Sequence, residues 1–184
     1  MTDLTPITAL GAEAPRARTF GPLTITEVAD LGLASLALRK RQSAPTVFGL
    51  SLPEPGKAVT GDTASAFWTG PGQWMIEGPG QGDSDFAARV KAEAPEASVT
   101  EQTDGFTAFD VVAATSDQID ALMAKLVNVD LSRFTMGHAT RTGLHHMTVF
   151  IIRRADTRLA VIGMRTLADA VWHALSDAAK RLEV

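Results

Sequence analysis

Short apolar segments separated by two or three turn residues recur along this chain, and this spacing strongly favours antiparallel β-sheet. The segments 147–154 and 158–164 flank Ala155, Asp156 and Thr157, so they predict a β-hairpin. Residues 66–77, AFWTGPGQWMIE, predict a second strand–turn–strand unit. Hairpins outnumber the positions where a parallel crossover would fit, which argues against a doubly wound parallel sheet.

Other segments add strands to this pattern. Residues 106–113 predict one more strand, and residues 23–40 predict two strands or a single strand bent at Gly32. Residues 46–52 fit either a short helix or a short strand. Residues 1–22 are rich in Ala, Pro, Gly and Thr without a period, so we expect a flexible arm followed by one domain over residues 23–184.

Three segments predict helices, at residues 84–94, 115–127 and 166–182. The middle one is the clearest, because its apolar residues form one continuous stripe at helical spacing. The predicted caps are Asp83 or Ser84 for the first helix, Thr115 with Gln118 for the second, and Thr166 with Asp169 for the third. Strands in hairpins combined with a few helices predict an α+β fold.

Composition excludes several classes of protein. The 184 residues are 45% hydrophobic and 21% charged, which is typical of a globular core, and the net charge of −4 gives no footprint for nucleic acid. The absence of cysteine excludes disulfides, thiolate nucleophiles and Cys-ligated zinc. Apolar runs are far shorter than the roughly 20 residues of a membrane span, and residues 1–22 lack the pattern of a signal peptide. We therefore expect no membrane partner and a cytoplasmic location.

Two glycine-rich tetrads, GPGQ at 70–73 and at 78–81, raise the question of a phosphate site. The first precedes a strand, so it lacks the helix N-terminus that a phosphate cradle uses, and Pro71 with Gly72 fits a type II turn. The second precedes a helix, but its spacing departs from GxGxxG and Asp83 and Asp85 would repel an anion. Both are predicted to be turns.

Polar residues give no self-sufficient active site, so we expect no catalytic, cofactor-binding or metal residue on this chain. His145 and His146 are neighbours on a predicted strand and would point to opposite faces. Asp104 and Asp110 could share a face as an acid/base pair, although ordinary strand-end carboxylates are commoner. Nothing marks a nucleophile elbow.

Trp68 and Trp74 flank the first tetrad. They could form an aromatic platform for a flat ligand, but large aromatic side chains are more often core or interface anchors. We expect these two residues to be subunit-interface or core anchors.

The order of several segments resembles the gamma subunit of heterotetrameric sarcosine oxidase. The carrying residues are ITEVADLGLASLALR at 25–39, FWTGPGQWMIEG at 67–78, TDGFTAFDV at 103–111, LVNVDLSRFTMGHATRTGL at 126–144 and VIGMRTLADAVWHAL at 161–175. That subunit is in turn similar to the folate-binding domain of the glycine-cleavage aminomethyltransferase. The resemblance implies two related ferredoxin-like halves of antiparallel sheet with packed helices.

The same resemblance implies a non-catalytic subunit of a complex that oxidatively demethylates sarcosine to glycine, with hydrogen peroxide and formaldehyde or methylene-tetrahydrofolate as co-products. The implied partners are the alpha, beta and delta subunits. FAD, FMN, NAD, zinc and tetrahydrofolate are implied for those partners, and no cofactor for this chain. The alternative is a stand-alone folate-binding protein or one-carbon transferase, for which Asp110 is the candidate acidic residue toward the pterin ring.

Overall fold

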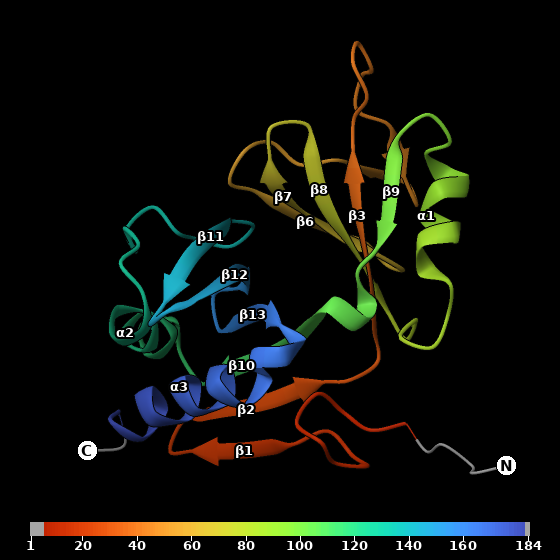
Figure 1. The fold of residues 1–184 in the computed structure, drawn as a ribbon. Coiled ribbons are helices and arrows are strands. Elements are labelled where there is room, and N and C mark those ends of the chain that lie inside the picture. The colour runs from red at the N-terminus through yellow and green to blue at the C-terminus, as the bar shows by residue number, and fades with distance from the viewer. Residues whose placement is uncertain (1–5, 183–184) are drawn as a thin grey trace, which may run out of the picture.

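Two antiparallel sheets lie face to face, with helices on their outer sides (Figure 1). The computed structural model describes residues 6–182. The six-stranded sheet has the order β1 (Ala17–Phe20), β2 (Leu23–Val28), β10 (Phe106–Ala113), β13 (Arg158–Met164), β12 (Met147–Ala155) and β11 (Ala139–Leu144). The five-stranded sheet has the order β6 (Ala58–Thr60), β7 (Ser65–Gly70), β8 (Gln73–Pro79), β3 (Leu31–Ala37) and β9 (Ser98–Glu101).

The helices cover the outer faces of the two sheets. Helices α2 (Ser116–Leu126) and α3 (Ala168–Lys180) share one core cluster with the six-stranded sheet, while α1 (Phe86–Glu93) shares another with the five-stranded sheet. A third cluster lies between the sheets. The remaining elements are the hairpin β4 (Thr46–Val47) and β5 (Leu50–Ser51) and the 3-10 turns η1 (Thr103–Gly105) and η2 (Arg165–Leu167).

The two halves repeat one strand order. In the larger sheet the order β2-β10-β13-β12 has α2 on the chain between β10 and β12, and in the smaller sheet β7-β8-β3-β9 has α1 between β8 and β9. After β13 the chain forms α3, and at the corresponding place after β3 it forms the β4–β5 hairpin. The predicted α+β fold of two related ferredoxin-like halves is therefore confirmed.

Most predicted elements match the structure, and α2 shows why. Thr115 is its N-cap and forms the predicted capping box with Gln118, whose Oε1 accepts the Thr115 N–H at 3.0 Å. Leu122 in the centre of the stripe is fully buried. Strand β10 and the β7–β8 and β12–β13 hairpins also lie where the sequence predicts them.

Two predicted helix caps are wrong. Asp85, rather than Asp83 or Ser84, caps α1 by accepting the Ala88 N–H at 3.0 Å. Helix α3 begins at Ala168 without a side-chain cap hydrogen bond, because the 3-10 turn η2 takes up Thr166 and moves the start of the α-helix two residues along.

The segment 23–40 forms two strands in different sheets, and the break lies at Ala29 and Asp30. Gly32 is therefore not the bend; it lies within β3, where Gln81 and Phe86 pack so closely that a Cβ would approach the Phe86 ring to 2.9 Å. The ambiguous segment 46–52 forms the β4–β5 hairpin.

The N-terminal region differs from the expected arm of residues 1–22. Residues 17–20 form β1, which pairs with β2 at the edge of the six-stranded sheet. The buried carboxylate of Glu27 also accepts the N–H groups of Leu10 at 3.0 Å and Arg16 at 3.1 Å. These hydrogen bonds hold the segment against the domain, although its sequence has no strand period. Residues 1–5 of the expected arm lie outside the described residues.

Candidate functional site

A polar pocket lies at one end of the apolar layer between the two sheets. Side chains alternate between the two faces of a strand. On β12, Ile152 faces the other sheet and belongs to the inter-sheet cluster, and Arg154 reaches the same layer from the irregularity in strand pairing between Arg153 and Ala155. On β8 the same alternation carries Met75 and then Glu77 toward that layer. Strand geometry in the two halves therefore brings an acidic and a basic side chain together.

Glu77 and Arg154 form a buried ion pair across the layer. The Arg154 Nη2 donates to Glu77 Oε1, and the side chains are only 16% and 1% exposed, respectively. Glu77 Oε2 and Arg154 Nη1 are also buried, and neither has a hydrogen-bond partner among the described residues. An unpaired buried polar atom costs about 1–3 kcal/mol, and more when it is charged. Each half of this pair is therefore only partly satisfied by the protein.

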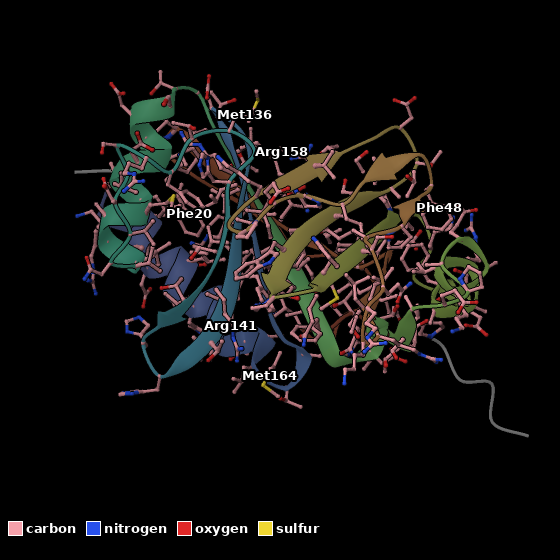
Figure 2. All side chains as sticks on the ribbon, turned by 90° about the horizontal axis from the view of Figure 1, so that it is seen from above. Phe20, Phe48, Met136, Arg141, Arg158 and Met164 are labelled. Atoms are coloured by element: carbon pink, nitrogen blue, oxygen red, sulfur yellow. The ribbon has the colours of Figure 1, made fainter. Side chains whose placement is uncertain are left out.

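A second ion pair lies beside the first. Arg158 at the start of β13 donates through Nη2 to Asp110 Oδ2 on β10, and its side chain is about half exposed. Figure 2 shows Arg158 where the two sheets meet. Both pairs line one pocket of about 190 Å³, together with Ser65 and Ala160 among others. The pocket thus holds two carboxylates and two guanidinium groups.

The sequence named Asp110 but missed Glu77, Arg154 and Arg158. For Glu77 the missed signal is a charge inside a run of buried strand residues, whereas Arg158 at the exposed start of β13 gives no such signal. Asp104 does not join Asp110 in an acid/base pair, because η1 places it in a different and larger pocket.

The larger pocket, of about 520 Å³, lies beside the N-terminal segment and is strongly acidic. Its charged lining residues are Glu13, Glu27, Asp30, Asp83, Asp104 and Arg165.

Asp30, one of these residues, also accounts for the second glycine tetrad. Its backbone oxygen accepts the Gly80 N–H at 2.9 Å and its carboxylate accepts the Gly82 N–H at 2.7 Å. The amides that would cradle a phosphate are bonded to an acidic residue, so this segment is a turn. The first tetrad is the β7–β8 turn, with Gly72 at a φ of 65°.

The histidines lie differently from the prediction. His145 and His146 are in the β11–β12 turn rather than on a strand, and His145 has a φ of 52°, so the argument from strand alternation does not apply. They line a pocket of about 480 Å³ that also includes His173 of α3. Within residues 6–182, however, no group of three or more His, Asp or Glu side chains is arranged to hold a metal ion.

The two tryptophans that flank the first tetrad, Trp68 and Trp74, pack into the five-stranded half. Trp74 is 7% exposed and belongs to the core cluster under α1, where its Nε1 donates to the Pro53 carbonyl at 2.8 Å. Trp68 is half-buried against the same cluster. Trp74 is thus a core residue, while an interface role for the exposed part of Trp68 stays a prediction.

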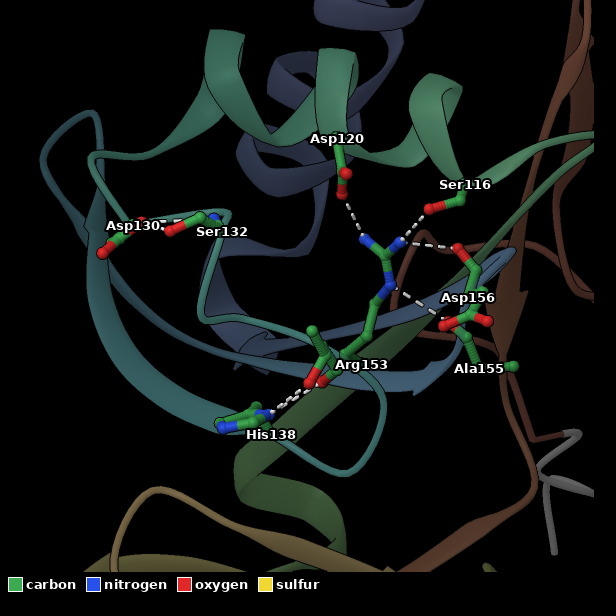
Figure 3. A network of polar contacts seen from close by, with 9 residues as sticks. Ser116, Asp120, Asp130, Ser132, His138, Arg153, Ala155 and Asp156 are labelled. Atoms are coloured by element: carbon green, nitrogen blue, oxygen red, sulfur yellow. Dashed lines mark hydrogen bonds and ion pairs between the residues drawn. The ribbon is translucent and has the colours of Figure 1, made fainter.

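Arg153, the neighbour of Arg154, faces the opposite side of β12 and is 3% exposed. Figure 3 shows its guanidinium bonded to Asp120 of α2 at 2.7 Å, to Ser116 at 3.3 Å, and to the carbonyls of Ala155 and Asp156. Its donors are well used, in contrast to those of Arg154. This network joins α2 to the β12–β13 hairpin and has a structural role.

Glu101 at the end of β9 joins that strand to α1. Burial acts to raise the pKa of the Glu101 carboxyl, but hydrogen bonds from the Thr103 hydroxyl and from the N–H groups of Ala87, Thr103 and Gln102 together lower it below its ordinary value. The Ala87 N–H lies in the first turn of α1 and donates to Glu101 at 2.9 Å. The carboxylate therefore satisfies a donor that the helix itself leaves unpaired.

Comparison with known proteins identifies solved structures with a similar fold. No family model and no curated protein matches the sequence. A chain of heterotetrameric sarcosine oxidase from Corynebacterium sp. U-96 is similar in structure, with a TM-score of 0.70 and 17% identity over 88% of this chain and 86% of that chain. The glycine cleavage system aminomethyltransferase T from Bartonella henselae has a TM-score of 0.56 and 10% identity, over 81% of this chain and 44% of that chain.

These likenesses confirm the predicted resemblance at the level of the fold, which is shared with both proteins. Within the part of the chain that the structure describes, no helix is long and apolar enough to cross a membrane.

Proposed function

We propose that this chain is the gamma subunit of a heterotetrameric sarcosine oxidase, a non-catalytic subunit that organises a complex oxidising sarcosine to glycine. The observation that carries the proposal is the extent of the structural match. It covers 88% of this chain and 86% of a chain from such an enzyme, but only 44% of the aminomethyltransferase. The chain therefore corresponds to nearly a whole subunit of the oxidase and to about half of the transferase.

In this proposal the partners are the alpha, beta and delta subunits, and the complex is cytoplasmic. Those partners hold FAD, FMN, NAD and zinc, and they release hydrogen peroxide with formaldehyde or methylene-tetrahydrofolate. The role of this chain is to present a folded surface to them. The half-buried Trp68 is the proposed interface anchor, because aromatic side chains contribute strongly to interfaces.

The alternative, a stand-alone folate-dependent protein, is favoured by the fold shared with the aminomethyltransferase. The pocket that holds Asp110 and the acidic pocket that holds Asp104 both fit a whole folate poorly. Asp110, the candidate pterin ligand, is already paired with Arg158, and its pocket of about 190 Å³ lies below the roughly 300–1,000 Å³ of most ligand sites. The pocket of about 520 Å³ is large enough, but its carboxylates would repel the glutamate tail of folate. In the subunit proposal, tetrahydrofolate belongs to a partner subunit.

Purification of the tagged chain from its native source tests the proposal. Larger flavin-bearing chains are expected to co-purify and to produce hydrogen peroxide from sarcosine, whereas the chain purified alone should be colourless and inactive. Recovery of the chain alone from its source, together with saturable tetrahydrofolate binding by that chain, would replace the subunit proposal with the alternative.

A further inference from the structure

We propose that the pocket between the two sheets binds a small zwitterion, a molecule that carries one carboxylate and one ammonium group, such as a short α-amino acid. The starting point is the incomplete Glu77–Arg154 pair. Glu77 is 1% exposed and lines the pocket, and its Oε2 has no partner among the described residues. Arg154 Nη1 is also buried and has no hydrogen-bond partner among the described residues.

These two atoms require ligand groups of opposite hydrogen-bonding character. A carboxylate oxygen only accepts hydrogen bonds and a guanidinium nitrogen only donates them. A ligand that completes both must therefore donate to Glu77 and accept from Arg154. An ammonium group beside a carboxylate supplies both functions, with charge-assisted hydrogen bonds on each side.

The charges of the whole pocket select against ligands with a net charge. Asp110 and Arg158 add a second carboxylate and a second guanidinium to the first pair, so the four charged side chains sum to zero. An anion would gain from the arginines but meet two carboxylates, and a cation would meet two arginines. A dipolar ligand aligned with the two pairs avoids both repulsions.

The volume limits the ligand to a few heavy atoms. An engineered protein cavity of about 150 Å³ holds benzene, so a pocket of about 190 Å³ accommodates a molecule of similar size. Glycine and N-methylglycine meet this limit, whereas amino acids with long side chains exceed it. This inference goes beyond the proposed function, which requires no ligand on this chain.

The test is a calorimetric or NMR titration of the full-length isolated chain. Glycine and N-methylglycine are the probes, and acetate and methylammonium, which carry one charge each, are the controls. Saturable binding is expected for the zwitterions, with both single-charge controls at least tenfold weaker.

Two phenylalanine variants place the binding in this pocket. Thr60 is exposed on β6 and lines the pocket, so Thr60→Phe narrows the pocket without changing either ion pair. Thr148 is an exposed strand threonine outside the pocket lining, so Thr148→Phe is the matched control. We expect Thr60→Phe to weaken zwitterion binding at least tenfold and Thr148→Phe to leave it unchanged.

Glu77→Gln keeps the shape of the side chain and removes its charge, and it should also abolish the preference for zwitterions over acetate. If Glu77→Gln fails to fold, the Thr60→Phe and Thr148→Phe variants still test whether the zwitterion binds in this pocket.

Three results would each overturn the proposal. These are no binding of either zwitterion, which would mean that water completes the ion pair; equal binding of acetate or methylammonium; and unchanged binding in Thr60→Phe. None of them bears on co-purification with flavin-bearing chains, so failure of this inference and failure of the proposed subunit role are separate outcomes.

Discussion

Gly78 on β8 should be far less tolerant of an added methyl group than its sequence context suggests. A Cβ at this position would lie 2.7 Å from Phe86 Cζ and closer still to Cε2. Apolar carbon atoms are most stable about 3.5–4.0 Å apart, so the ring would have to move by roughly 1 Å. Phe86 is 1% exposed in the core under α1 and has little free space for such a movement.

The expected magnitude follows from two opposing terms. Overpacking a tight core costs about 1–3 kcal/mol, while Gly→Ala gains about 0.4–1 kcal/mol by restricting the unfolded chain. Gly78→Ala should therefore lower the free energy of unfolding by about 1–2 kcal/mol. With a urea m-value of about 2 kcal/mol/M, the denaturation midpoint should fall by about 0.5–1 M at unchanged slope.

Gly143→Ala is the matched control, because Gly143 is also on a strand but has no atom within 4 Å of an added Cβ. Its midpoint should stay the same or rise. Combining Gly78→Ala with Phe86→Leu should cost less than the sum of the two changes, since the smaller side chain makes room for the methyl group. A Gly78→Ala midpoint equal to that of Gly143→Ala would refute the packing explanation.

Three further changes test other parts of the structure. Leu122→Ala should lower the free energy of unfolding by about 2–5 kcal/mol, since Leu122 is fully buried; an unchanged midpoint would show that the α2 stripe is not core. Gly72→Val places a β-branched residue at a φ of 65° and should cost about 1–3 kcal/mol by calorimetry, whereas a normal melting temperature would contradict the turn assignment. Glu101→Gln should cost about 0.5–2 kcal/mol at pH 7. Because the pKa of Glu101 is lowered on folding, its contribution is present above the ordinary glutamate pKa of about 4.3 and disappears as the pH falls below it, so wild type and variant should converge in acid; a constant difference down to pH 3 would contradict this.

Local signals explain which elements the sequence predicts well. The stripe and capping box of α2 lie close together in the sequence, and the two strands of each predicted hairpin are joined directly by a short turn. β1 was missed because its four residues have no period of their own and form a strand only by pairing with β2. The start of α3 was misplaced because Thr166, the predicted cap, lies inside the 3-10 turn η2 that precedes the helix.

The candidate pocket depends on contacts between distant parts of the chain, so the sequence patterns did not predict it. Glu77 and Arg154 are separated by 77 residues and meet only because two sheets from different parts of the chain lie face to face. Asp110 was found as an acidic strand residue, but its partner Arg158 and its separation from Asp104 follow from sheet register and the η1 turn. The alternation of residues predicts which face of a strand a side chain lies on, but it does not predict which residue of the other sheet that side chain meets.

The strand order also implies a sequence of events during folding. The whole five-stranded sheet, from β3 to β9, lies on the chain between β2 and β10, which are neighbours in the other sheet. Its strands and α1 can therefore assemble from nearby segments as soon as they leave the ribosome, while β2 must wait for β10 to arrive. Pairing of distant segments is slow because it closes a long loop. In pulsed hydrogen exchange we expect the amides of β7 and β8 to gain protection before those of β2, so the inserted half would form first and bring the ends of the other half together.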